Sequence, residues 1–490
     1  MSVSDKSKST APSLQLAALE FKITPDAETT VDVRHGGKAT EIASGLKTMV
    51  MMLEDKGKTL CLVTTHFGPS IPVNVSKLFR ETLADDLDIP VSNVLIFTSH
   101  NHTSVALASN GVLTYNAYAT PAPEAELLPV GETFFATLRK CASRLRAMLV
   151  PVTVSWAEGS EDRITYYRKG RRENGTTYLM REEDREQLGD DFQGDVDHQA
   201  PIIIFKNVEG DPVAGLVQFT GHPVTAYHPE NTVVFGEWSQ VACDIVSGKI
   251  AAPVGFLQGC AGDVNSKEMF TGGVSRSTEF GEMLGESYLE ALESLRESGR
   301  DGMDVTLKTV RLPLASLPSP EFLNGEMTVI DDFMKRAEAG DENTLECVGQ
   351  NFAKGLSPQY RAWLISLVRP WNLWALDLHE REAVDSIDYF QEMEIAVIRI
   401  GDVGIVGLPC EPFQNIGRQI REQSPLPLTI PCGYMNINHG YIADSENLGD
   451  NEYMSAHHRY TKFRAPLKAP AGDVLATEGV KRLKDFSHEL

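Results

Sequence analysis

The sequence predicts an α/β protein whose mixed sheet core is flanked by helices. Short apolar runs of strand length alternate along the chain with helix-like segments, and no internal repeat or low-complexity stretch interrupts them. This alternation is the pattern of layered α/β folds. With 490 residues, of which 42% are hydrophobic, the chain is long enough to build one continuous core.

The predicted strands are apolar along their whole length, so we expect them to be buried in a mainly parallel or mixed sheet. They cover residues 60–63, 94–97, 202–205, 216–219, 254–257, 395–398 and 403–406. Between these runs, helical patterns have the length and spacing of helices packed on a sheet. They cover residues 41–55, 74–87, 131–148, 277–297 and 413–422.

The domain organisation that we predict is simple. Residues 1–12 are polar and are expected to be disordered. We expect residues 13–490 to form a single domain. Within it, a less regular stretch of about 301–390 contains Trp363, Trp371 and Trp374 among helix formers, and we interpret it as a helical insertion.

Charge and composition exclude several classes of partner. The formal charge of −23 argues against nucleic acid or an anionic membrane surface, since both require a basic patch. No apolar run is long enough for a membrane span or a signal peptide, so we expect a cytoplasmic protein, and a homo-oligomer is compatible with the sequence. The seven scattered cysteines contain no C-x-x-C pair and are expected to be reduced.

Two histidines follow the predicted strand 94–97 directly. His100 and His102 are separated by one residue, so in an extended chain their side chains point the same way. Neutral imidazole is a good ligand for Zn²⁺, which needs about three protein ligands in a catalytic site. The pair therefore predicts a metal site, with further ligands supplied from elsewhere in the chain.

Three more predicted strands end in small, polar turns. Each of these turns follows an apolar run that is expected to be a buried strand, as the His-x-His segment does, and each contains histidine, aspartate or glutamate. The turns cover residues 220–225, 258–265 and 407–413. In open α/β sheets, ligands bind outside the carboxyl ends of the strands. We therefore expect the four turns to converge on one site.

The same turns carry a resemblance to a known family. The order and spacing of five short motifs resemble those of the neutral/alkaline, non-lysosomal ceramidases, a family of zinc hydrolases, and of their bacterial relatives. The motifs are TSHNHTS (98–104), FTGHPVT (219–225), FLQGCAGDVN (256–265), GLPCEPF (407–413) and NHGYIADSENLGDNEY (438–453). The resemblance implies a ceramidase-like catalytic domain, and the short segment after Tyr453 leaves no room for the family's separate immunoglobulin-like domain.

Carried over by position, the family's metal site falls on His100, His222, Glu411 and Tyr441. Two imidazoles, a carboxylate and a phenol oxygen form a suitable set for one Zn²⁺ and leave a position for water or substrate. Glu411 also precedes a predicted helix, where a carboxylate is favourable for electrostatic reasons alone, and Tyr441 could be a core residue.

The resemblance also suggests residues that act beside the metal. His102 would orient water or transfer a proton, although it could instead replace His100 as the direct ligand. Arg168 would contact the substrate or the oxyanion, and Tyr453 would donate a hydrogen bond to the oxyanion. Asp263 would orient a ligand or, equally well, cap a helix.

One position departs from the family. Ceramidases carry serine after the Gly-Asp-Val of the third turn, whereas this chain has Asn265, which makes ceramide itself doubtful as the substrate. From the predicted metal site and the resemblance, we predict a zinc-dependent hydrolase that uses metal-activated water. Its substrate would be an amide or ester of a small or amphiphilic metabolite. The alternatives are a metal-dependent lyase or isomerase acting next to a carbonyl, and a non-catalytic ligand-binding relative.

Overall fold

A computed structural model describes residues 12–26, 38–109, 125–184, 188–189, 193–230, 232–460 and 463–488. The predicted disordered segment therefore lies outside the described residues, except for residue 12. Within the described ranges, no helix combines the length and the apolar character that a membrane crossing requires.

Two sheets form the centre of the molecule. The larger sheet has the order β13 (Val254–Gln258), β11 (Pro212–Phe219), β10 (Ile202–Asn207), β6 (Val150–Ala157), β1 (Gln15–Ile23), β3 (Leu46–Asp55), β4 (Lys58–Thr65) and β5 (Val94–Thr98), and β15 (Arg296–Glu297) also pairs with β6. The smaller sheet has the order β16 (Met303–Pro313), β19 (Phe390–Ile400), β20 (Val403–Gly407) and β22 (Leu428–Cys432). Both sheets combine parallel and antiparallel pairs, so the predicted mixed sheet is confirmed.

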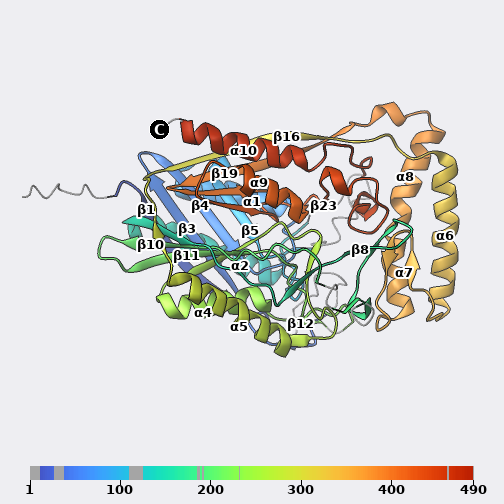
Figure 1. Ribbon diagram of the computed structural model, residues 1–490, viewed down its shortest axis with the longest axis horizontal. Helices are drawn as coiled ribbons and strands as arrows, with labels where there is room; N and C mark the ends of the chain where they lie inside the picture. The colour runs from blue at the N-terminus through green and yellow to red at the C-terminus, as the bar shows by residue number, and fades with distance from the viewer. Residues whose placement is uncertain are drawn as a thin grey trace, which may run out of the picture.

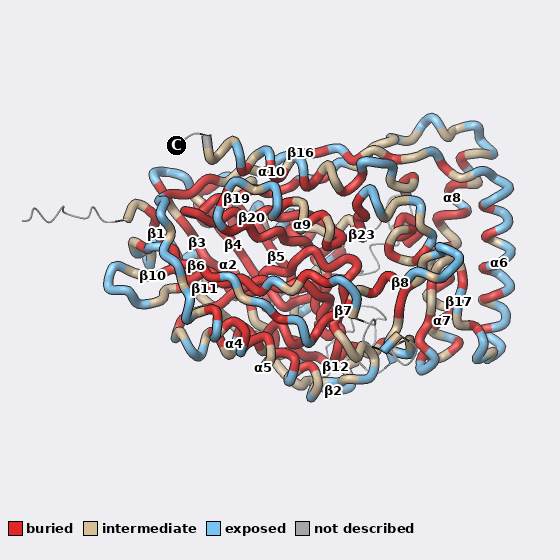
Figure 2. The backbone as a smooth tube through the Cα atoms, viewed as in Figure 1, coloured by how far each residue is buried: buried red, intermediate tan, exposed pale blue. Residues whose placement is uncertain are grey.

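The two sheets pack face to face. One buried cluster joins Met51 and Leu62 of the larger sheet to Ile398 and Ile405 of the smaller one. Figure 2 shows this interior as the most continuously buried part of the molecule. Neighbouring residues on one strand contribute to opposite faces, as Ile202 and Ile203 do, because side chains alternate along a strand.

Helices cover the outer faces of the two sheets, which gives a helix–sheet–sheet–helix layering (Figure 1). Four helices pack on the larger sheet: α1 (Val73–Leu87), α2 (Pro129–Met148), α4 (Glu237–Ile250) and α5 (Gly273–Leu292). Two helices pack on the smaller sheet: α9 (Gln414–Gln423) and α10 (Asp473–His488). The α/β prediction is thus confirmed, and burial of the sheets on both faces explains why their strands lack polar alternation.

Parallel neighbours position the functional turns. β4 pairs with β5, β11 with β13, and β20 with β22, each pair in parallel. Parallel strands that lie side by side end at the same edge of the sheet. The turns after β5, β11, β13 and β20 therefore come from edges that a single site can reach.

The predicted helical insertion contains helices but begins with a strand. Residues 303–313 form β16 of the smaller sheet, and helices α6 (Pro320–Glu338), α7 (Pro358–Ser366) and α8 (Arg369–Glu380) follow. In Figure 1 these three helices lie together at the end of the molecule that is far from the two central sheets. They enclose apolar clusters of their own, which include Trp371 and Phe333.

The predicted helix over residues 41–55 is wrong. Residues 46–55 form strand β3, which pairs antiparallel with β1 on one side and β4 on the other. The run Met49–Leu53 is rich in residues that favour helices, but it is buried on both faces between two strands. A continuous apolar run does not distinguish a central strand from a buried helix. Here the backbone pairing with β1 and β4 determines that the segment is a strand.

Candidate metal centre

His100 lies two residues beyond β5, in a backbone conformation that is unusual for histidine. Its φ is +62°, in the left-handed region that costs a residue with a side chain of order 1–3 kcal/mol. The ring is buried, and its Nδ1 lies 2.7 Å from the carbonyl oxygen of Pro69. A carbonyl only accepts, so Nδ1 carries the hydrogen, and Nε2 is the ring nitrogen that faces Glu411.

His222 is oriented in the same way by a different loop. It follows β11 and forms a parallel bridge with Asn265, and its Nδ1 lies 3.1 Å from the carbonyl oxygen of Val264. Burial, and next the positive charge of Arg168, lower the pKa of His222 to about 3. The ring is therefore neutral at physiological pH, with its Nε2 lone pair available to a ligand.

A short parallel pair of strands brings Glu411 and Tyr441 together. In β21 (Glu411–Pro412) and β23 (Tyr441–Ile442), these two residues lie directly opposite each other. The Tyr441 hydroxyl is 3.4 Å from Nε2 of His222, and one Glu411 carboxylate oxygen is 3.2 Å from Nε2 of both His100 and His222. The structure thus brings the four predicted metal ligands into one buried group.

The donor atoms of this group fit a cation. Burial raises the pKa of the Glu411 carboxyl, but His100 and His222 together bring it well below its usual value, so Glu411 is an anion. Both imidazoles turn Nε2 toward this anion, and within the described part of the chain Nε2 of His100 is buried with no hydrogen-bond partner assigned to it. Two imidazole nitrogens, a carboxylate oxygen and a phenol oxygen that converge in one buried space form a donor set suited to Zn²⁺.

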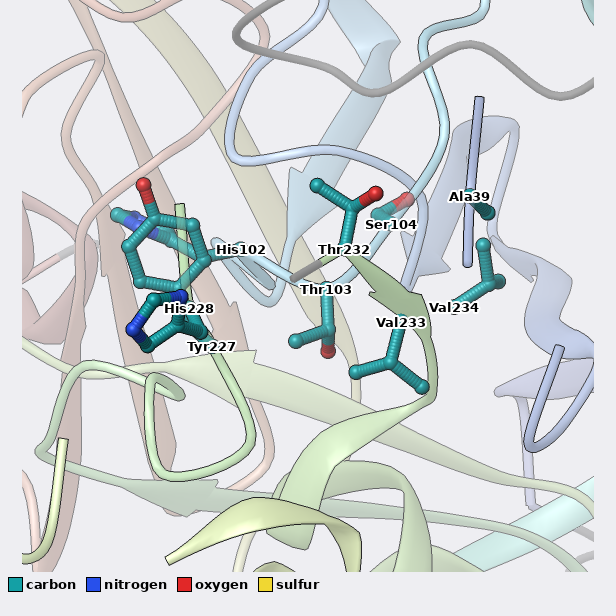
Figure 3. Close-up of a pocket in the computed structure, with 9 residues that line it drawn as sticks. All are labelled: Ala39, His102, Thr103, Ser104, Tyr227, His228, Thr232, Val233 and Val234. Atoms are coloured by element: carbon teal, nitrogen blue, oxygen red, sulfur yellow. The ribbon is translucent and has the colours of Figure 1, made fainter. Parts of the chain in front are cut away.

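His102 belongs to the same cluster. The nearest ring nitrogens of His100, His102 and His222 all lie within 4.8 Å of one another, and all three side chains are buried. The His102 ring lies 4.7 Å from that of His100 and 5.4 Å from that of Tyr227, measured between centroids. Figure 3 shows His102, Tyr227 and His228 gathered on one side of a small pocket that His102 helps to line.

Arg168 and Asn265 contact each other beside the cluster. Arg168 lies between β7 (Thr165–Tyr167) and β8 (Lys169–Arg171), and its guanidinium is buried 5.2 Å from the centre of the Tyr441 ring. It donates to the Asn265 side-chain oxygen at 3.0 Å and to the Gly262 carbonyl at 2.7 Å. The amide of Asn265 therefore holds the arginine, which places a fixed positive charge next to the metal ligands.

The remaining two predicted residues lie farther out. The Tyr453 ring is 5.6 Å from that of Tyr441. The Asp263 carboxylate accepts the N–H of Gln414, the first residue of α9, at 2.7 Å. Of the two roles predicted for Asp263, this hydrogen bond corresponds to the capping of a helix, here α9. Burial raises the pKa of Asp263 to about 7.

Several residues at the site were not identified from the sequence. The Tyr434 ring lies 4.3 Å from the His100 ring, and Asn438 donates to the second carboxylate oxygen of Glu411 at 2.9 Å. His457 lies 4.4 Å from the Tyr441 ring. Asn438 stands in the NHGY motif, only three residues before Tyr441, so proximity in sequence was an available signal. Tyr434 and His457 carried no such signal.

No family model and no curated sequence matches the chain. A solved neutral ceramidase from Pseudomonas aeruginosa superposes with a TM-score of 0.64 and 14% identity, covering 98% of this chain and 75% of that one. The chain has the neutral ceramidase fold. A ceramidase complexed with C2 gives the same TM-score with 16% identity, covering 98% of this chain and 76% of that one.

The neutral ceramidase fold extends over nearly all of this chain, so the sheets and the turns that carry the buried histidines belong to one shared architecture. At these levels of identity the likeness concerns the fold. The chemistry must be argued from the side chains described above.

Proposed function

We propose that this chain is a zinc-dependent hydrolase that cleaves an amide or ester bond of a small or amphiphilic metabolite. The observation that carries the proposal is the convergence of two buried imidazole nitrogens on one carboxylate oxygen, each at 3.2 Å. The fold gives further support, because the solved structures that share it include an enzyme named for its action on ceramide. In this proposal His100, His222 and Glu411 hold the ion, with Tyr441 as the fourth ligand.

Bound zinc would supply an activated water and polarise the carbonyl of the substrate. The neighbouring side chains then have distinct tasks. His102 lies against the ligand rings and would carry a proton between water and the leaving group. The buried Arg168, together with Tyr441 and Tyr453, would stabilise the negative charge that develops on the carbonyl oxygen.

The reaction consumes one water molecule. The C–N or C–O bond of the substrate breaks, the hydroxyl of water joins the acyl carbon, and the amine or alcohol leaves with the remaining proton. Asn265 has a different task from the serine of ceramidases, because its side-chain oxygen is occupied by Arg168. We therefore place the substrate among amides and esters other than ceramide.

Metal analysis tests this proposal directly. The purified protein should contain about one zinc per chain, and His222→Ala should lose most of it. His379→Ala is a suitable control. His379 lies on helix α8, far from the site, and its ring forms a hydrogen bond with the carbonyl oxygen of Pro318. Stoichiometric metal retained by His222→Ala would remove the proposed ligand set.

Isotope labelling separates hydrolysis from a lyase or isomerase reaction. Turnover in H₂¹⁸O should place one label in the acid product, because the acyl carbon receives the oxygen of water. A product without label would exclude a hydrolase that uses water in this way.

A further inference from the structure

A second cavity lies beside the metal centre. Its volume is about 320 Å³, within the range of small-molecule sites. The residues that line it include Tyr166, Arg181, His228, Met269, Phe270 and Leu356. One face is apolar, from the rings and from the Met269 and Leu356 side chains. The charged and polar lining includes Arg181, His228 and Glu183, so a ligand with an apolar part and an anionic part fits the cavity if its anion lies on Arg181.

Two contact paths connect this cavity to the metal centre. His228 lines both the cavity and the small pocket of Figure 3, which also contains His102. On the other side, the Asn265 amide nitrogen lies 3.3 Å from the Met269 sulfur, which lies 4.0 Å from the Arg181 guanidinium. A molecule in the cavity is thus one residue away from the groups proposed to act on the carbonyl.

Arg181 is a cation that forms no ion pair with any described residue, although the Glu183 carboxylate acts on it from a longer distance. Its guanidinium donates to the backbone carbonyl of Asn351 at 2.7 Å, and its Nε atom is buried without a hydrogen bond. Among the described residues, no carboxylate lies within ion-pair distance of it, and Glu183, which also lines the cavity, accepts instead from the backbone N–H of Lys354. Burial lowers the pKa of Arg181, as is expected of a cation that is removed from water.

We propose that this cavity binds the amino-acid part of an N-acyl amino acid, with the carboxylate on Arg181 and an apolar side chain against Phe270 and Leu356. This inference rests on the proposed hydrolase function and names its substrate class. Arg181 is only partly exposed, and an anionic ligand would supply an ion-pair partner that no carboxylate among the described residues provides. Hydrolysis breaks the amide C–N bond and adds the hydroxyl of water to the acyl carbon, and the free amino acid takes the proton.

A matched pair of substrates tests the charge requirement. N-octanoyl-L-leucine carries the carboxylate, and N-octanoyl-L-leucinol replaces it with a neutral hydroxymethyl group. The zinc-loaded protein should hydrolyse the anionic substrate with a kcat/KM about ten- to a hundred-fold higher, as expected for one charge-assisted pair. Equal kcat/KM values for the two substrates would overturn the inference.

Variants locate the preference. Arg181→Gln should remove it by lowering kcat/KM for the anionic substrate only, and Arg181→Lys should retain part of it. Arg311→Gln, which changes an exposed arginine on β16, is the matched control and should retain the full preference. An Arg181→Gln variant that still prefers the anion, or that loses activity equally on both substrates, would contradict the assignment.

Filling the cavity is an independent test. Gly355 lines it, and a Cβ atom added there meets no other heavy atom within 4 Å, so Gly355→Leu can project into the space without a clash at the backbone. This variant should lower kcat/KM for both substrates while the zinc content stays unchanged. Full activity of Gly355→Leu would show that the substrate does not enter the cavity.

Binding measurements separate this inference from the proposed hydrolase function. Calorimetry with N-octanoyl-L-leucine needs no turnover, and wild type should bind at least ten-fold more tightly than Arg181→Gln. If zinc-loaded wild type hydrolyses neither substrate but shows this difference, the hydrolase proposal fails and the carboxylate site stands. If both proteins bind equally, the carboxylate site fails.

Discussion

Glu237, the first residue of α4, offers the sharpest quantitative prediction. Its side chain is completely buried. One carboxylate oxygen accepts the backbone N–H of Ala226 at 2.8 Å, in the loop that follows His222, and the other accepts the Ser277 hydroxyl. Burial raises the pKa of Glu237 to about 7 from 4.5, although these hydrogen bonds act in the opposite direction.

The sign of the pH effect follows from that change in pKa. The unfolded chain loses the Glu237 proton near pH 4.5, whereas the folded protein keeps it until about pH 7. The contribution of this group to stability is therefore complete below pH 4.5 and declines as the pH rises to 7. Two and a half pH units correspond to about 3 kcal/mol.

Glu237→Gln removes the titration and preserves the geometry. The amide oxygen still accepts from Ala226, and the amide nitrogen can donate to the Ser277 hydroxyl. The free energy of unfolding of the variant, relative to wild type, should therefore rise by about 3 kcal/mol between pH 4.5 and pH 8. Other groups titrate equally in both proteins and cancel in the difference.

Urea unfolding measures this difference. Transitions are followed by tryptophan fluorescence at several pH values, and buried Trp238 lies next to the substituted residue. Glu380→Gln, on the exposed face of α8, is the control and should show no trend. A constant difference between wild type and Glu237→Gln across this range would refute the argument from burial.

Three further substitutions test the site and the core. Asn265→Ser should lower kcat/KM about ten- to a hundred-fold, because Arg168 loses the side-chain oxygen that accepts from it at 3.0 Å. Asn265→Asp keeps an oxygen at this position, so equal activities of the two variants would contradict the role of Asn265. Tyr441→Phe should weaken zinc binding by about 10–100-fold in a competition with a chelating dye, since its hydroxyl lies beside His222, and unchanged affinity would exclude it as a ligand. Phe134→Ala should lower the free energy of unfolding by about 3–5 kcal/mol, because its buried ring packs against three other phenylalanines, while the zinc content stays the same. A loss of zinc in this variant would show that the core and the metal centre are coupled.

Much of the fold was accessible from the sequence because its strands are buried on both faces. The predicted strand at 94–97 became β5, and the predicted helix at 74–87 became α1. The same feature misled at residues 46–55, where an apolar run rich in methionine fits a buried helix as well as a central strand. The pairing partners of β3, not its own residues, settled the matter.

The cytoplasmic location and the oligomeric state stay predictions, as does the assignment of residues 13–490 to a single catalytic domain. The site residues stay proposals as ligands and catalysts, although their positions are now described. Subcellular fractionation and light scattering address the first two.

The sequence by itself determined which residues are available for chemistry. His100, His222 and Glu411 stand in turns that follow apolar strands, and Tyr441 stands in the last of the family motifs. Polar side chains are expected in such turns, because the backbone there leaves the buried sheet. Only the tertiary structure decided how they act. The carbonyls of Pro69 and Val264 fix which ring nitrogen faces the carboxylate. Arg181, whose guanidinium donates to a backbone carbonyl, lines a second cavity. These features depend on contacts between segments far apart in the chain, which local sequence patterns do not encode.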